Sequence, residues 1–339
     1  MDSVAKSSRR DRAQLFEAAE GKRSPRIPAA VMEKDFWVCW TLHRLFTVLK
    51  FCPQIIFKGG TSLSKVFKVI NRFSEDIDLS LNRRDLGFAE ERNPEQAGIS
   101  KGEVKRRLEA LVEECKRTVK DKLLPDLRLD FTSVLGASGW SVELDADDPQ
   151  TVVFAYPQSD ITAQLEYVRP TIRLEMGARS DDWPAVESEI TPYAAEDFPK
   201  AFSQPKCLVR TLSAERTFWE KATLLHAEFH RPETKATAER RSRHYYDLYC
   251  LSRHAIGVEA LKRGDLRERV VQHKSLFFAS AWANYASAKP GTFRLVPNEK
   301  ALSVLSRDYD AMQAMMFGPS PEWDQIIEEL AQLEKKINS

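Results

Sequence analysis

Paired glycines and paired acids occur in one short stretch of the sequence, FKGGTSLSKVFKVINRFSEDIDLSL (57–81), as Gly59, Gly60, Asp76 and Asp78. Mg²⁺ prefers carboxylate oxygens and usually keeps waters and substrate phosphates as its other ligands. Two acids at positions i and i+2 of a strand lie on the same face, so both can reach the same metal ions. Main-chain N–H groups of a glycine turn that opens a helix can bind phosphate oxygens. The stretch therefore predicts a site for a polyphosphate and the metal ions that neutralise it.

Each part of this pattern also has an ordinary structural explanation. Alternating Asp and Ile is common on a half-exposed edge strand, and a double glycine is common in turns. The stretch is not a P-loop, because Ser64 rather than glycine precedes Lys65. The combination of these features, in the order strand, turn, helix and strand, is what favours a functional site.

The elements that must position these residues follow from the hydrophobic periodicity. QIIFKGG is typical of a strand that enters a tight turn, and TSLSKVFKVI (61–70) has the apolar spacing of a helix. In DIDLSL (76–81) apolar and polar residues alternate, which predicts a strand. Helices are expected over residues 11–50, and a long helix over 100–124 begins with Ser100 and Glu103 in capping-box spacing.

The rest of the chain predicts an α+β protein in three parts. Further strands are expected at LRLDF (127–131), TVVFAY (151–156) and TIRLEMG (171–177), with proline-containing loops over 183–206. From Ser213 onward the pattern is almost wholly helical. We therefore expect an N-terminal helical arm (1–50), a mixed α/β core (51–205) and a helical C-terminal domain (206–339).

Composition excludes several classes of protein. The 339 residues include 42% hydrophobic and 30% charged residues, with a formal net charge of +1, so attraction to nucleic acid must come from local patches. The five cysteines form no C-x-x-C pair, which argues against a disulfide framework and a zinc site. The N-terminus has no signal-peptide core, and no run approaches the roughly 18 apolar residues of a membrane span. A soluble, cytoplasmic protein is expected.

Several motifs together resemble a known family. FKGGTSLSK…RFSEDIDL resembles the signature of minimal nucleotidyltransferases of the DNA polymerase β-like superfamily, and more closely that of the AbiEii/AbiGii toxin family. EKDFWVCWTLHRLF upstream, and ERTFWEKATLLH and RSRHYYDLY downstream, are similar to other motifs of that family in the same order. The matches span roughly residues 30–250, whereas residues 255–339 carry no matching motif. The resemblance implies a polymerase β-like nucleotidyltransferase core.

The resemblance also implies roles for individual residues. Asp76 and Asp78 match the metal-binding pair, and Glu175 is expected to be the third carboxylate, with Glu166 as its competitor. The residues expected to bind the nucleotide are Lys58, Gly59, Gly60, Thr61, Ser62, Arg72 and Ser74. Ser74 is also a candidate for regulation, because a phosphate there would add negative charge beside the carboxylates. Lys221 and Asp247 match catalytic positions in the C-terminal motifs; the alternative is that they form an ion network between helices with Glu220.

A basic segment follows these motifs. Residues 231–246 carry five basic residues against the two acids Glu233 and Glu239, and tyrosines lie within and just after the segment (Tyr245, Tyr246, Tyr249). Arg240, Arg241 and Arg243 are expected to contact an RNA backbone, with the tyrosines available to stack on a base. The alternative is a solvated helix face.

Other conspicuous residues have simpler explanations. HAEFH (226–230) does not match the zincin motif, which needs its glutamate directly after the first histidine. Tryptophans 37, 40 and 219 and Phe218 are expected in the core, and the cysteines are expected to be buried and inert.

The reaction that the resemblance implies is attack of an acceptor hydroxyl on the α-phosphate of an NTP, with release of pyrophosphate. Mg²⁺ or Mn²⁺ would be the cofactor, the tRNA 3′ end a possible acceptor, and a cognate antitoxin encoded nearby the partner, in a toxin–antitoxin or phage-defence system. Two alternatives remain open at this point: NMP transfer to a protein side chain, and a non-catalytic NTP- or RNA-binding protein.

Overall fold

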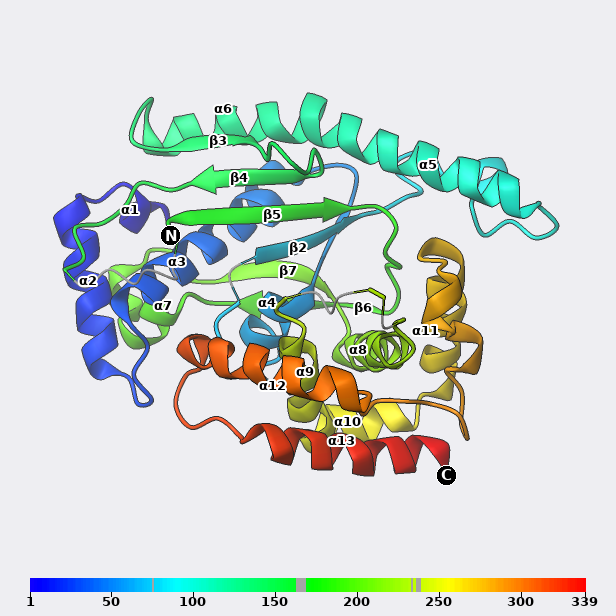
Figure 1. The fold of residues 1–339 in the computed structure, drawn as a ribbon. Coiled ribbons are helices and arrows are strands. Elements are labelled where there is room, and N and C mark those ends of the chain that lie inside the picture. The colour runs from blue at the N-terminus through cyan, green and yellow to red at the C-terminus, as the bar shows by residue number, and fades with distance from the viewer. Residues whose placement is uncertain (75, 163–168, 233, 236–238) are drawn as a thin grey trace. The chain divides into compact units, whose positions relative to one another are not determined.

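The computed structural model describes residues 1–74, 76–162, 169–232, 234–235 and 239–339 (Figure 1). The chain divides into two compact units. The first comprises Met1–Val66 and Phe73–Thr211, and the second comprises Phe67–Arg72 and Leu212–Ser339. Residues 67–72 therefore belong to the second unit, although in sequence they lie between the glycine turn and the paired acids.

The first unit is built on a mixed seven-stranded sheet, which confirms the α+β class (Figure 1). The strand order is β3-β4-β5-β2-β1-β7-β6, and the central strand β2 pairs parallel with β5 and antiparallel with β1. The strands are β1 Ile55–Lys58, β2 Asp76–Leu81, β3 Ser141–Leu144, β4 Thr151–Ala155, β5 Thr171–Gly177, β6 Ala185–Ile190 and β7 Cys207–Leu212.

The helices of this unit are α1 Asp2–Ala5, α2 Arg9–Lys22, α3 Ala29–His43, α4 Gly59–Lys65, α5 Lys101–Thr118, α6 Leu124–Leu135 and α7 Tyr193–Asp197. Ser100 caps α5 as predicted, since its side chain accepts a hydrogen bond from the Glu103 main-chain N–H. Helix α3 supplies the centre of the core. Its Trp40 packs on Phe131 of α6 with ring centroids 4.7 Å apart, and Phe131 packs on Phe154 of β4 at the same distance.

Three predictions about local structure were wrong. LRLDF lies within helix α6, because Leu124, Leu127 and Phe131 are buried at helical spacing and this packing outweighs the alternation of the short segment. Helix α4 ends at Lys65 rather than near residue 70, and Lys68 adopts a left-handed backbone. Residues 183–206 are not only loops, since they contain the short helix α7 and the edge strand β6, whose exposed residues fall on both faces and leave no apolar alternation.

The second unit is helical, as predicted. Its helices are α8 Ala214–Phe229, α9 Ser242–Arg253, α10 Ala255–Leu261, α11 Gly264–Phe277, α12 Glu299–Met312 and α13 Trp323–Asn338. Helix α8 packs on α9, α10 and α11, while α9 also packs on α12 and α13. Trp219 of α8 is buried and donates its indole N–H to the Ala260 carbonyl at 2.9 Å, which confirms its place in the core.

The cysteines depart from expectation at two positions. All five are free; Cys39, Cys115 and Cys207 are buried as predicted, but Cys52 is exposed and Cys250 is half-buried. Among the helices that the structure describes, none has the length and apolar character needed to cross a membrane.

Candidate functional site

Five charged residues occupy one face of three adjacent strands in the first unit: Lys58, Asp76, Asp78, Arg173 and Glu175. The sheet register pairs Asp78 with Lys58 on β1 and with Glu175 on β5, and it pairs Asp76 with Arg173. Directly paired residues project to the same face of a sheet, so these five side chains form one charged surface. All five are half-buried, while the apolar residues that alternate with them are buried against the core.

The glycine turn and the paired acids meet in space at Gly59 and Asp78. Gly59 has φ +81°, and a Cβ placed on it would lie 1.8 Å from Asp78 Oδ2. The carboxylate therefore lies directly against the main chain that opens α4. Within the described ranges, the Asp78 carboxylate makes no hydrogen bond or ion pair. This arrangement leaves its oxygens available to a ligand beside the first turn of α4.

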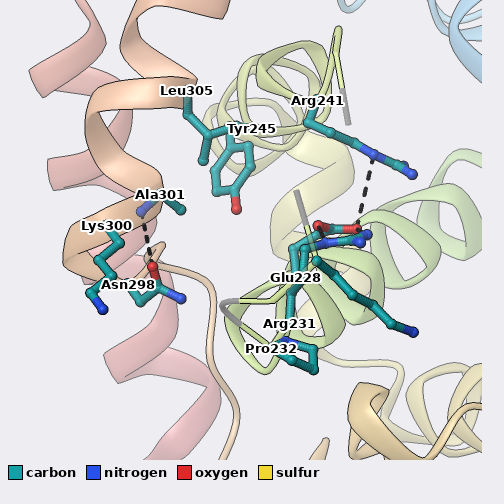
Figure 2. Close-up of a pocket in the computed structure, with 10 residues that line it drawn as sticks. Glu228, Arg231, Pro232, Arg241, Tyr245, Asn298, Lys300, Ala301 and Leu305 are labelled. Carbon is teal, nitrogen blue, oxygen red and sulfur yellow. Dashed lines mark hydrogen bonds and ion pairs between the residues drawn. The ribbon is translucent and has the colours of Figure 1, made fainter. Parts of the chain in front are cut away.

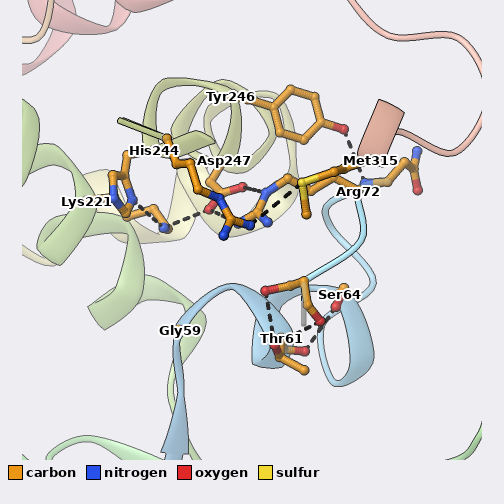
Figure 3. A network of polar contacts seen from close by, with 12 residues as sticks. Gly59, Thr61, Ser64, Arg72, Lys221, His244, Tyr246, Asp247 and Met315 are labelled. Atoms are coloured by element: carbon orange, nitrogen blue, oxygen red, sulfur yellow. Dashed lines mark hydrogen bonds and ion pairs between the residues drawn. The ribbon is translucent and has the colours of Figure 1, made fainter. Parts of the chain in front are cut away.

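Two side-chain hydroxyls hold this turn in place by hydrogen bonds, one to the segment that carries the acids and one within the turn itself. The Thr61 hydroxyl donates to the main-chain carbonyl of Asp76 and lies 3.0 Å from Ser74 Oγ (Figure 3). The Ser62 hydroxyl donates to the Gly59 carbonyl at 2.9 Å. Because Thr61 and Ser62 are buried, their side chains hold the turn in place, and only their main-chain N–H groups could bind a phosphate.

Lys65, at the end of α4, also has a structural role. Its ammonium lies 2.7 Å from the Asp35 carboxylate, and both side chains are 4% exposed. Burial lowers the pKa of Lys65, but Asp35 outweighs burial and raises the pKa above its ordinary value. Asp35 also accepts the main-chain N–H of Tyr193 at 2.7 Å. This pair ties α4 to α3, so the upstream EKDFW motif supports the turn from inside the core.

Arg173 is a residue of this surface that the sequence reasoning missed. Its guanidinium lies 2.6 Å from Asp145 and 3.8 Å from Glu175. Burial lowers the pKa of Arg173, but the hydrogen bond to Asp145 and the charges of Glu175 and Asp76 outweigh it and raise the pKa. The signal was its position two residues before Glu175, which places it on the same face of the strand.

The second unit contains a buried ion network centred on Asp247. Arg72 donates to both oxygens of Asp247, at 2.8 and 2.9 Å, and Lys221 Nζ lies 2.7 Å from Oδ2 (Figure 3). Lys221 Nζ also lies 3.3 Å from His244 Nδ1. The Arg72 side chain is 4% exposed, the Lys221 side chain 10%, and the Asp247 side chain is fully buried.

Two cations sharing one carboxylate explain the protonation of this network. Burial raises the pKa of Asp247, but Arg72 and Lys221 outweigh it and hold the pKa well below its ordinary value. Burial and Arg72 lower the pKa of Lys221 more than Asp247 raises it. Burial and the neighbouring Lys221 also hold the pKa of His244 well below its ordinary value. His244 is therefore neutral, and its Nδ1 can accept a hydrogen bond from the Lys221 ammonium.

The structure brings Lys221 and Asp247 together, but the third member is Arg72 rather than Glu220. Glu220 lies 3.3 Å from Arg216 within α8. Arg72 is expected from the sequence to add positive charge at the triphosphate. In the structure its guanidinium donates hydrogen bonds to Asp247.

The predicted RNA-binding arginines lie at the start of α9. The Arg240 main-chain N–H donates to Asp308 at 2.7 Å, while the Arg241 guanidinium is 3.9 Å from Glu228. Arg243 is half-buried on α9. Two of the tyrosines expected to stack on a base do not offer their rings to solvent, because Tyr245 is 1% and Tyr246 3% exposed. Glu166, the competing third carboxylate, and Glu233 lie outside the described residues.

Both ring nitrogens of His226 on α8 have contacts within the protein. His226 Nδ1 accepts the Arg294 main-chain N–H at 3.0 Å, and Nε2 lies 3.2 Å from the Asn284 carbonyl. Burial lowers the pKa of His226 to about 4, so it is neutral at physiological pH.

The charged surface of the first unit has donors suited to Mg²⁺ or Mn²⁺. No three His, Cys, Asp or Glu side chains in the described ranges already surround a metal-sized position. Magnesium sites commonly use only one or two carboxylates, together with waters and substrate phosphates. Asp76 and Asp78 fit that pattern, and the Asp78 carboxylate has no partner among the residues that the structure describes.

Comparison with known proteins identifies a matching family model and a similar solved structure. A family model described as "Nucleotidyl transferase AbiEii toxin, Type IV TA system" matches residues 40–329. No curated protein matched the chain. Among solved structures, MenT4, a nucleotidyltransferase toxin from Mycobacterium tuberculosis H37Rv, is similar over 97% of this chain and 99% of its own, with 15% identity and a TM-score of 0.44.

Proposed function

The chain belongs to the AbiEii family of nucleotidyltransferase toxins from type IV toxin–antitoxin systems, and from this premise we propose that it transfers NMP from an NTP to a hydroxyl of RNA. The proposed acceptor is the 3′ end of tRNA, and the proposed partner is a cognate antitoxin protein. Membership of a toxin family supports the partner, while the charge and geometry of the chain's own residues support the chemistry.

The observation that carries the proposal is the contact between Asp78 and Gly59. Phosphoryl chemistry needs carboxylates for metal ions beside donors for phosphate oxygens. The absence of a side chain at residue 59 lets the Asp78 carboxylate lie against the start of α4. Asp76 on the same strand and Glu175 on the neighbouring strand share its face of the sheet.

We assign the residues of the first unit as follows. Asp76 and Asp78 would hold Mg²⁺ or Mn²⁺, with Glu175 as third carboxylate. Bound there, the metal would neutralise phosphate charge and increase the acidity of the acceptor hydroxyl. The main-chain N–H groups of residues 59–62, with the Lys58 ammonium, would bind and orient the triphosphate. Ser74 supports this turn through Thr61.

The bond changes balance without another reactant. The acceptor oxygen forms a bond to the α-phosphorus, and the bond from that phosphorus to the bridging oxygen breaks. Pyrophosphate leaves, and the hydroxyl proton passes to Glu175 and then to solvent. In the second unit, Lys221 is proposed to bind a substrate phosphate as a point charge. Asp247 would hold it in position, while Arg72 would keep Asp247 ionised.

The test is a transfer assay with Mg²⁺, total tRNA and each α-³²P-NTP in turn. We expect label on tRNA with one or two nucleotides, and a loss of label in Asp78→Asn. The matched control is Asp126→Asn, which removes an exposed carboxylate on α6 and should retain full activity. Label on protein but not on tRNA would indicate that the acceptor is a protein side chain. Bound NTP with no label on any acceptor would refute a transferase.

A further inference from the structure

A cavity of about 180 Å³ lies within the second unit, among the end of α8, the start of α9 and the start of α12 (Figure 2). Basic side chains dominate its wall. Among the residues that the structure describes, the charged lining residues are the cations Arg231, Lys235, Arg241 and Lys300 and the carboxylate Glu228, a formal sum of +3. We call this cavity the anion pocket.

Glu228, the carboxylate among the described lining residues of the anion pocket, is already engaged. Arg231 donates to both oxygens of Glu228, at 2.7 and 2.8 Å. Arg231 and Glu228 balance each other in charge, so the described part of the wall keeps a positive formal charge. A cavity with this charge favours an anionic occupant.

Two donors in the wall lack acceptors. Tyr245 is 1% exposed, and its hydroxyl points into the space between Glu228 and Asn298 (Figure 2). It makes no hydrogen bond to any residue that the structure describes. Arg241 Nε is likewise buried without a hydrogen-bond acceptor in the described part of the chain. A buried donor without an acceptor costs about 1–3 kcal/mol, so Arg241 Nε favours an occupant that supplies oxygen atoms, to which the Tyr245 hydroxyl could also donate.

We propose that the anion pocket binds a phosphate group of the acceptor RNA, an inference that rests on the proposed function. The volume is below the roughly 300–1,000 Å³ of sites that enclose a whole small molecule, so a single group fits better than a nucleotide. Arginine and lysine side chains are the common protein ligands of phosphate.

Two further features favour RNA as the source of that phosphate. Trp282 lies beside the basic wall, where Arg231 covers its ring at 4.6 Å and Lys235 at 5.6 Å. Cations with aromatic rings are the usual composition of surfaces that bind single-stranded RNA. Glu228 also follows Lys221 by seven residues on α8, which is about two turns or roughly 10 Å along the helix. The pocket would hold the acceptor at that distance from the proposed catalytic lysine.

The test is filter binding of 5′-³²P-labelled total tRNA without NTP, so that binding is measured apart from transfer. For Arg241→Gln/Lys300→Gln we expect about a tenfold rise in Kd at 0.1 M salt. The plot of log association constant against log salt should also become less steep, by one to two in the magnitude of its slope. Tyr245→Phe keeps the buried ring and removes only the donor, so it should weaken binding about threefold without changing the slope.

Two controls keep the result interpretable. Lys262→Gln/Arg263→Gln removes two exposed cations from the same unit, and it should leave Kd and slope unchanged. Arg241→Lys/Lys300→Arg keeps the charge and should restore most of the binding. Wild-type binding by all pocket variants, with tRNA still labelled in the transfer assay, would overturn the pocket and leave the proposed function intact. A wild-type protein that neither binds nor labels tRNA would overturn both.

Discussion

The Asp78 carboxylate occupies the space that a side chain at residue 59 would need. An ideal Cβ on Gly59 would lie 1.8 Å from Asp78 Oδ2 and 2.6 Å from its Cγ. The backbone sets the position of a Cβ, so no side-chain torsion could relieve this overlap. Either the turn or the acid would have to move. The glycine and the acid, nineteen positions apart in sequence, are therefore parts of one site.

Gly59→Ala should strongly reduce transfer while the protein stays folded. The left-handed backbone at residue 59 adds about 1–2 kcal/mol of strain, and displacement of Asp78 by about 1 Å should reduce transfer about 100-fold. Gly98→Ala is the matched control, because Gly98 has the same φ of +81° but no atom within 4 Å of its Cβ position. Gly98→Ala should lower the free energy of unfolding but leave transfer unchanged. The measurements are NMP transfer and urea unfolding, and equal activity of the two variants would contradict the expectation.

Asp78→Asn should lose activity without losing stability. It removes a carboxylate that has no partner among the described residues and that shares a face with Asp76 and Glu175. We expect transfer to fall about 10²–10³-fold, as when one electrostatic group of an active site is removed. The free energy of unfolding should stay constant or rise by up to about 1 kcal/mol as repulsion is relieved. A large loss of stability would mean that the carboxylate is structural.

Arg173→Gln should strengthen metal binding. Its guanidinium lies 3.8 Å from Glu175 on the surface proposed to bind Mg²⁺, and removing a positive charge from that surface should favour a divalent cation. We expect the half-saturating Mg²⁺ concentration for transfer to fall several-fold, with a parallel fall in the Kd for Mn²⁺ measured by electron paramagnetic resonance. Arg84→Gln, which removes an exposed arginine elsewhere in the unit, should change neither value. Weaker metal binding in Arg173→Gln would show that the arginine supports the site instead.

Asp247→Asn should destabilise the second unit strongly. The change leaves Arg72 and Lys221 buried without their shared carboxylate, which typically costs about 3–5 kcal/mol. Urea unfolding gives the value directly. Asp265→Asn breaks the exposed pair with Arg263 and should cost less than about 1 kcal/mol. Similar losses in the two variants would argue against a buried network.

Protonation of His226 should destabilise the second unit at mildly acid pH. Its pKa is lowered to about 4 by burial, with His230 and Arg294 acting in the same direction and Glu334 opposing them. Between pH 6.5 and 4 the unfolded chain binds a proton at this residue that the folded chain excludes, so stability falls as pH falls through that window. The loss should reach roughly 3 kcal/mol near pH 4.

Urea unfolding at pH 7.5, 6, 5 and 4 measures this loss. His226→Asn should remove most of it, whereas His254→Gln, on the exposed start of α10, should retain it. An unchanged pH dependence in His226→Asn would assign the loss to other groups.

Sequence patterns predicted the elements of the site better than their surroundings. The strand at 76–81, the turn at Gly59 and the strand at 171–177 carry strong local signals, namely alternation and glycine, and all three are present. The strand predicted at 127–131 was wrong because a short apolar run has no period of its own until its neighbours decide which residues are buried. Arg173 was overlooked because its position two residues before Glu175 gains meaning only when the neighbouring strand places that face beside Asp76 and Asp78.

By itself, the sequence determined the family, the mixed α/β and helical parts, and which carboxylates share a strand face, because these depend on residue order and on periods of two and 3.6. Only the tertiary structure decided that Asp78 lies against Gly59, that Arg72 shares Asp247 with Lys221, and that cations from three segments line the anion pocket. These relationships join residues far apart in the chain. They depend on strand order and helix packing, which set distances that no local pattern encodes.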